Sequence, residues 1–184
     1  DDALLEVFLD HLNGDDVIVN SAQPEITEAT YGVKAVPTYF RVPRYSFIRA
    51  ILDADLIVFG GGSLLKEIEG PTVGRIIYLL RILGLVGLAK LTQGKTAMIS
   101  VGIGPLHGRS YRQLSRLCAN WTDFITVRDE PSKALLSEIQ TTTNVIATAD
   151  VVLTVPAVTP QKVKLPSGSM RVAVIPRYSL TQEE

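Results

Sequence analysis

Short apolar runs alternate along the chain with longer segments in which apolar residues recur at helical spacing. The short runs are typical of buried strands, and the periodic segments are typical of helices that bury one face. Strands that alternate with helices pair in parallel and are covered on both sides. The pattern therefore predicts an α/β fold with a parallel sheet and helices on both faces. We expect its strands at residues 17–20, 56–59, 96–101, 124–127 and 145–149.

The predicted helices fill the intervals between these strands. Within residues 1–12, Leu4, Phe8 and Leu12 share one face with two further leucines. In an alternating pattern a strand should precede this helix, so we interpret the sequence as a segment of a longer protein. Further helices are expected at residues 45–52, 72–91 and 110–121, and from Glu130 to a point before Thr141.

The helix at residues 72–91 is nearly all hydrocarbon between Ile76 and Ala89. Arg81 would lie near the centre of any membrane span, and the uninterrupted apolar part is too short to cross a bilayer. We expect a buried helix or one that touches a membrane surface, which would allow peripheral membrane association.

The alternation of apolar runs and helical segments ends after Asp150. A short apolar stretch is followed by prolines at 156, 160 and 166, and a new apolar run begins at Met170. Prolines and small polar residues are typical of a connecting segment. We therefore predict a domain at residues 1–155, a linker at 156–169 and the start of a second domain at 170–184.

Composition narrows the classes of partner and site. The chain has 18 basic and 19 acidic residues, so no charge excess indicates a nucleic-acid partner. Cys118 is the only cysteine, which excludes an intrachain disulfide, and its apolar neighbours predict a buried core thiol. With only His11 and His107 as histidines, no spacing indicates a metal site.

The most distinctive local pattern is an apolar run that stops at Gly60, Gly61 and Gly62, after which Ser63 is expected to open a polar turn. Consecutive glycines are conformationally costly, so they are kept where side chains would block a close approach to the backbone. Two interpretations remain open at this stage. The segment is either a buried strand that ends at a ligand or a tight turn.

Three further predicted strand ends carry distinctive residues, at 102–105, at 128–130 and at Asp150. Ligands of open parallel sheets bind beyond the carboxyl ends of the strands. The glycine loops would let an anion approach the backbone, and Arg128 could bind a carboxylate or phosphate in bidentate fashion. The pattern predicts a site for a small, multiply charged anion. In the alternative interpretation, Arg128 and Asp129 form a structural pair and the glycines only shape turns.

Four blocks together resemble the polysaccharide pyruvyl transferase family. They are Gly-Gly-Gly-Ser-Leu-Leu-Lys at 60–66, Gly-Ile-Gly-Pro-Leu at 102–106, Ile-Thr-Val-Arg-Asp-Glu-Pro-Ser at 125–132 and Thr-Ala-Asp at 148–150. The opening Asp-Asp-Ala is similar to the end of the family's Gly-Asn-x-Gly-Asp-(Glu/Asp)-Ala motif. Asp1 would then be the motif aspartate.

This resemblance implies an enzyme that transfers the enolpyruvyl group of phosphoenolpyruvate to two hydroxyls of a sugar in a cell-surface polysaccharide or its precursor. The products would be a cyclic pyruvate ketal and free phosphate, with no cofactor. It also implies a Rossmann-like domain, the first half of a GT-B-like pair. The acceptor would be a sugar or a lipid-linked glycan, in the cytoplasm or at the inner face of the membrane.

The resemblance also implies roles for individual residues. Arg128 would bind the phosphate or carboxylate of phosphoenolpyruvate, and Asp1 would lie near the sugar hydroxyls, so that both are candidate catalytic residues. The candidate substrate-binding residues are Gly61, Gly62, Ser63, Gly104, Arg128 and Glu130.

The family's catalytic histidine and a basic residue belong to a second half, and neither His11 nor His107 matches that motif. We therefore expect this chain alone to form at most part of an active site and to catalyse no turnover.

Three rival interpretations stay open. Gly102-x-Gly104-x-x-x-Gly108 after a strand, with Asp129 at the next strand end, is compatible with dinucleotide binding, although Pro105 removes an amide that a pyrophosphate would use. A nucleotide-sugar glycosyltransferase would share the two-domain layout. The third rival is a non-catalytic binding relative.

Overall fold

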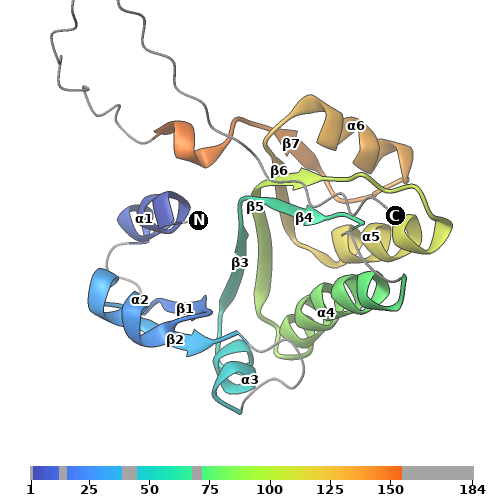
Figure 1. Ribbon diagram of the computed structural model, residues 1–184. Helices are drawn as coiled ribbons and strands as arrows, with labels where there is room; N and C mark the ends of the chain where they lie inside the picture. The colour runs from blue at the N-terminus through green and yellow to red at the C-terminus, as the bar shows by residue number, and fades with distance from the viewer. Residues whose placement is uncertain (1, 13–15, 39–44, 68–71, 155–184) are drawn as a thin grey trace, which may run out of the picture.

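The computed structural model describes residues 2–12, 16–38, 45–67 and 72–154, in which helices and strands alternate (Figure 1). The elements are α1 (Asp2–His11), β1 (Ile18–Ser21), α2 (Pro24–Tyr31), β2 (Lys34–Pro37), α3 (Tyr45–Leu52), β3 (Leu56–Gly60), β4 (Ser63–Leu65), α4 (Thr72–Leu91), β5 (Lys95–Ile103), α5 (Arg109–Trp121), β6 (Phe124–Val127), α6 (Glu130–Glu138), β7 (Val145–Ala147) and the 3-10 helix η1 (Val151–Thr154). The predicted linker at 156–169 and the predicted start of a second domain at 170–184 lie outside the described residues.

The main sheet has the strand order β3-β5-β6-β7, and every pairing in it is parallel. The order of these strands in the sheet follows their order in the sequence. Right-handed connections between them therefore place α4, α5 and α6 on the same face. Figure 1 shows these three helices together on one side and α1 on the other. The predicted parallel sheet with helices on both faces is confirmed, and the fold is Rossmann-like.

A second, two-stranded sheet pairs β1 with β2 in parallel. The sequence pattern predicted β1 but missed both α2 and β2. The helix α2 has no buried residue, so no apolar periodicity marks it, and β2 is only four residues long. The strand expected before α1 remains a prediction.

Strand β3 ends at Gly60, as predicted, but Ser63 begins strand β4, which corrects the expected polar turn at Ser63. Strand β4 continues along the same edge of β5 that β3 occupies, with Ser63 opposite Gly102. Gly61 and Gly62 have φ angles of 57° and 65°, in the left-handed region that favours glycine. The amide of Gly61 donates to the carbonyl of Ile99 at 2.9 Å, so the interruption stays hydrogen-bonded to β5.

Helix α1 explains two of the three glycines. A Cβ atom at Gly60 would clash with the ring of Phe8, and one at Gly61 would clash with the side chain of Leu4. A Cβ atom at Gly62 would meet nothing within 4 Å. The close approach that Gly60 and Gly61 allow is therefore the packing of α1 against the end of β3.

The core fills the space between the sheet and helices α4 and α5. Cys118 is fully buried there, and burial raises the pKa of its thiol to about 12, which confirms the predicted core thiol. None of the described helices, α4 included, has the length and apolar character needed to cross a membrane. The largest fully buried apolar side chains are Leu65, Leu79, Met98, Ile125, Leu136, Val86, Val101 and Val127.

Asp123 ties the first residues of β5 to the end of α5. One oxygen of its carboxylate accepts hydrogen bonds from the backbone amide and the hydroxyl of Thr96, at 2.9 and 3.0 Å. The other lies 3.7 Å from Lys90 Nζ and 3.6 Å from Lys95 Nζ. Burial alone would raise the pKa of Asp123, but the Thr96 hydrogen bonds and then the two lysines bring it below its ordinary value of 3.8.

The substitution Gly61→Ala tests the packing of α1, with Gly62→Ala as the matched control. Both variants place alanine at positive φ, which costs about 1–2 kcal/mol. Only Gly61→Ala must also displace Leu4, at a further cost of about 1–3 kcal/mol. Denaturant unfolding, together with hydrogen exchange of α1, should show the larger loss for Gly61→Ala. Equal losses would contradict the packing explanation.

The substitution Asp123→Asn should lower the free energy of unfolding by about 1 kcal/mol at neutral pH, because it removes the charge from these hydrogen bonds. The native pKa of Asp123 is depressed, so its stabilisation is complete well above pH 3.8 and is lost as the pH falls through the lower native value. Urea unfolding of both proteins from neutral to acidic pH should show the difference shrinking below pH 3.8. A constant difference over that range would contradict this assignment.

Candidate functional site

The carboxyl edge of the main sheet brings together residues of β4 and β5 and residues that follow β6 and β7. Ser63 of β4 pairs with Gly102 of β5, Arg128 directly follows β6, and Asp150 follows β7. The guanidinium of Arg128 lies within 3.5 Å of both Ser63 Oγ and Asp150 Oδ2. Three of the four predicted strand-end segments therefore meet at Arg128, and the fourth, at 102–105, lies beneath it.

Gly102 provides the surface on which the Arg128 side chain rests. A Cβ atom at this position would lie 2.9–3.1 Å from the guanidinium atoms Nη2, Nε and Cζ. That separation is shorter than ordinary contact distances, so any other residue at 102 would push the guanidinium away. Gly102 is thus required for the position of Arg128.

The guanidinium of Arg128 has three oxygen partners at long range. Its Nη2 lies 3.3 Å from Ser63 Oγ, its Nη1 lies 3.5 Å from Asp150 Oδ2, and its Nε lies 3.7 Å from Asp129 Oδ2. Charge-assisted hydrogen bonds of optimal strength are about 2.7–2.9 Å long. About a third of the side chain is exposed, so the guanidinium is oriented but not fully engaged.

Asp129 has a structural task in addition to its contact with Arg128. It is the N-cap of α6, and its carboxylate accepts a 2.7 Å hydrogen bond from the amide of Ser132. The hydroxyl and amide of Ser132, and then the charge of Arg128, hold the pKa of Asp129 below its ordinary value. The buried hydroxyl of Ser132 also accepts a bond from the amide of Ile103. The structural-pair interpretation of Arg128 and Asp129 is thus supported, and the anion site remains a prediction.

Ser100 holds the segment that carries Asp150. It lies at an irregularity in β5 with a φ angle of 54°, which is uncommon for a residue other than glycine. Its buried hydroxyl donates to the carbonyl of Ala149 at 2.5 Å and accepts from the amide of Val151 at 3.1 Å. These two bonds clamp the residues on either side of Asp150, so Ser100 sets where that carboxylate meets Arg128.

The side chain of Glu67, from the segment after β4, lies at the N-terminus of α5. Its Oε1 atom accepts hydrogen bonds from the amides of His107 and Gly108, at 2.5 and 2.7 Å. A carboxylate is stabilised at a helix N-terminus by free amides and by the helix dipole. In a dinucleotide-binding domain a pyrophosphate would need this position, so the internal carboxylate argues against that rival interpretation.

Three glycines of this edge use their amides within the fold. The amides of Gly61, Gly102 and Gly104 donate to the backbone carbonyls of Ile99, Gly62 and Leu65. These three amides are therefore not free to hold an anion, whereas the guanidinium of Arg128 is partly exposed.

The remaining predicted site residues have different surroundings. Gly104 has a φ angle of 91° and packs against Leu135 of α6. Glu130 is exposed in the first turn of α6, with no hydrogen bond or ion pair among the described residues. Asp1 lies outside the described residues, so its role remains a prediction.

Three contributors at this edge were missing from the predicted site. The sequence marked Asp150 as a strand-end residue without assigning it a role, and the resemblance placed it in a Thr-Ala-Asp block. Ser100 could have been noticed as a hydroxyl that interrupts the apolar run of β5. Glu67 gave no signal, because its partners lie about forty residues away in the sequence.

The fold and this edge define a Rossmann-like domain with a fixed guanidinium at the carboxyl ends of its parallel strands. A family model described as Polysaccharide pyruvyl transferase matches residues 1–183, and the chain belongs to that family. Comparison with curated proteins and with solved structures gives no significant match.

The substitution Glu67→Ala should lower the free energy of unfolding by about 2 kcal/mol, because two amides lose a charged acceptor. Glu67→Gln keeps an acceptor oxygen at the same place and should lose less. Chemical denaturation, with hydrogen exchange at residues 107 and 108, measures both effects. If the alanine variant were as stable and as protected as the parent, Glu67 would have no capping role.

Proposed function

We propose that this domain binds phosphoenolpyruvate at Arg128 and belongs to an enzyme that transfers its enolpyruvyl group to a sugar. Membership of the family supports pyruvyl transfer and a polysaccharide acceptor in general. The observation that supports this donor site is the position of the Arg128 guanidinium, which Ser63 and Asp150 hold above Gly102.

The chemistry of phosphoenolpyruvate suits a planar guanidinium. The molecule is a small anion with a carboxylate and a phosphate, and arginine binds either group through two parallel hydrogen bonds. Because the present partners of Arg128 are 3.3–3.7 Å away, an oxyanion can form shorter hydrogen bonds with the guanidinium than they do, without any movement of the backbone. Asp129 and Asp150 then keep the guanidinium plane aimed at the ligand.

The reaction joins two sugar hydroxyls to the central carbon of phosphoenolpyruvate. Addition of the first hydroxyl is balanced by a proton on the methylene carbon, and the second hydroxyl displaces phosphate to close the ketal. Negative charge builds up on the departing phosphate, where a fixed cation stabilises it. Arg128 is proposed for this task, and Asp1 is proposed to lie near the sugar hydroxyls.

The rest of the active site is proposed to come from a second Rossmann-like half in a GT-B-like arrangement. The family's catalytic histidine and a basic residue belong to that half. This chain alone is therefore proposed to bind the donor without forming a ketal. The proposed acceptor is a sugar or a lipid-linked glycan, and the proposed location is the cytoplasm.

The donor proposal is tested by calorimetric titration of phosphoenolpyruvate into the protein and its variants. Arg128→Ala should weaken binding about 30-fold or more, because hydrogen bonds to charged groups contribute about 2 kcal/mol. Arg128→Lys keeps the charge but loses the planar fork, so it should restore only part of the affinity. The matched control is Arg49→Ala, which removes an exposed arginine of α3 that pairs with Asp53.

Equal affinity in Arg128→Ala and the parent, with an unchanged circular dichroism spectrum, would contradict the proposed donor site. Titration with NAD distinguishes the proposed donor site from a dinucleotide-binding site, which would bind NAD but not phosphoenolpyruvate. A binding-only relative would bind phosphoenolpyruvate but still give no ketal once the second half is supplied.

A further inference from the structure

Helix α4 exposes an apolar stripe of four large side chains, three in its first half and one at its end. Val73, Ile77, Leu80 and Leu91 are 69%, 43%, 47% and 82% exposed. Their spacing places them on one helical face, opposite the buried residues that pack on the sheet. Large aliphatic side chains that line up on an exposed face mark a contact surface rather than scattered surface residues.

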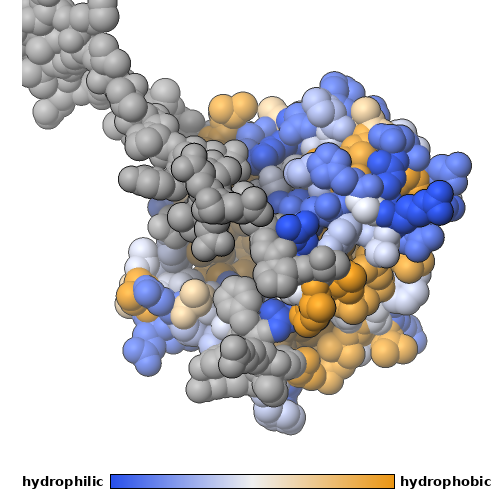
Figure 2. Space-filling view, turned by 45° about the vertical axis from the view of Figure 1, so that its right-hand side comes forward, coloured by the Kyte–Doolittle hydropathy of each residue, from blue (hydrophilic) through white to orange (hydrophobic). Residues whose placement is uncertain are grey.

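Helix α5 widens this stripe. Leu117 and Trp121 are 43% and 42% exposed, and Gly87 of α4 lies against the ring of Trp121. The two helices are in extensive contact, so their exposed apolar side chains adjoin. Figure 2 shows an apolar area on this side of the molecule, bordered above by strongly hydrophilic side chains.

The charges on the two helices all have the same sign. Helix α4 carries Arg75, Arg81 and Lys90, helix α5 carries three arginines, and neither helix contains Asp or Glu. The chain as a whole has a net charge of −1, so these two helices are a local concentration of positive charge. Among the described residues, Asp123 forms an ion pair with Lys90 and Glu138 forms one with Arg112. Arg75 and Arg81 also have interaction partners of their own.

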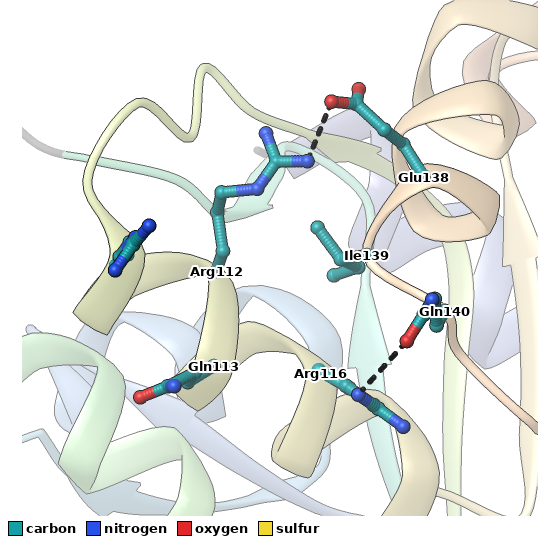
Figure 3. A pocket seen from close by; sticks show the side chains of 7 residues that line it. Arg112, Gln113, Arg116, Glu138, Ile139 and Gln140 are labelled. Atoms are coloured by element: carbon teal, nitrogen blue, oxygen red, sulfur yellow. Dashed lines mark hydrogen bonds and ion pairs between the residues drawn. The ribbon is translucent and has the colours of Figure 1, made fainter.

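A groove of about 330 Å³ lies between α5 and the end of α6, and it contains the three arginines of α5 (Figure 3). Arg112 pairs with Glu138 at 2.6 Å, and Arg116 donates to the side-chain oxygen of Gln140 at 3.4 Å. Arg109 is exposed, and its guanidinium forms no hydrogen bond or ion pair with another described residue. The groove therefore offers guanidinium groups to an external anion.

We propose that the α4–α5 face docks the protein on the surface of an anionic lipid bilayer. The apolar stripe would enter the boundary between headgroups and acyl chains, where tryptophan is also favoured. The arginines of the groove would contact lipid phosphates, since basic side chains beside an apolar face strengthen binding to anionic lipids. A second copy is a poorer occupant, because a symmetric contact would bring the cations of both copies together.

The geometry gives this docking a consequence for the active site. Arg112 also donates to the carbonyl of Leu106, at 3.3 Å, so the groove adjoins the loop that follows β5. That loop belongs to the carboxyl edge of the sheet. Docking would then bring the carboxyl edge of the sheet near the lipid surface. If the proposed function is correct, a lipid-linked acceptor would be held there.

The test is co-sedimentation of the full chain with vesicles of phosphatidylglycerol and phosphatidylcholine in equal parts, compared with phosphatidylcholine alone. The parent protein should bind only the anionic vesicles, and added salt should weaken the binding. The double variant Ile77→Asp with Leu80→Asp should bind at least about tenfold more weakly, because it places charge in the stripe. The double variant Arg109→Gln with Arg116→Gln should lose roughly fivefold for each arginine.

Matched controls separate the face from general surface effects. Ile26→Asp replaces a 60% exposed aliphatic residue of α2, and Lys34→Gln with Arg49→Gln removes two exposed cations elsewhere. Both controls should bind like the parent, and thermal unfolding should show every variant folded. The affinity for phosphoenolpyruvate should be unchanged in the face variants, so failure of this proposal is distinguishable from failure of the donor site.

Absence of binding to anionic vesicles by the parent would overturn the proposal, as would equal binding by the face variants. Sedimentation equilibrium supplies the remaining outcome. A parent dimer that Ile77→Asp with Leu80→Asp converts to a monomer, without vesicle binding, would show a self-association interface and overturn lipid docking.

Discussion

The ladder that β5 forms with its neighbours on both sides is the constraint on which the rest of the structure depends. On one edge β5 pairs with β3 and then β4, and on the other it pairs with β6. The core side chains of β5 face α4 and α5, and its carboxyl half carries Ser100 and Gly102. A shift in its register would therefore disturb the core and the functional edge together.

The two glycine segments show why a motif can be located correctly while its role is misjudged. The sequence indicated that something approaches the backbone closely at Gly60, Gly61 and Gly102. The structure identifies these neighbours as Phe8, Leu4 and Arg128, all belonging to the same chain. The amides of Gly61, Gly102 and Gly104 donate to backbone carbonyls, so the proposed recognition of an anion rests on the side chain of Arg128 rather than on these amides.

The alternation of apolar runs was sufficient to predict the parallel sheet, because each main strand is short and each of its helices buries a periodic face. The same reasoning missed α2 and β2, which bury too little to leave a pattern. It also missed Ser100 and Glu67, whose partners are distant in sequence. Their contacts form only when the segments after β4 and β7 fold back onto β5. A local sequence pattern does not indicate such long-range pairings.

The charges around Arg128 explain why this edge needs a further source of positive charge. Asp129 and Asp150 both approach the single guanidinium, and the depressed pKa of Asp129 keeps that carboxylate ionised. The two carboxylates orient Arg128 before any ligand arrives, which lowers the entropic cost of binding. They also cancel its charge at longer range, so attraction of a multiply charged donor cannot come from this group alone. This edge therefore fixes the orientation of the guanidinium toward a ligand. A cation that faces it from outside the described residues would supply the missing electrostatic attraction.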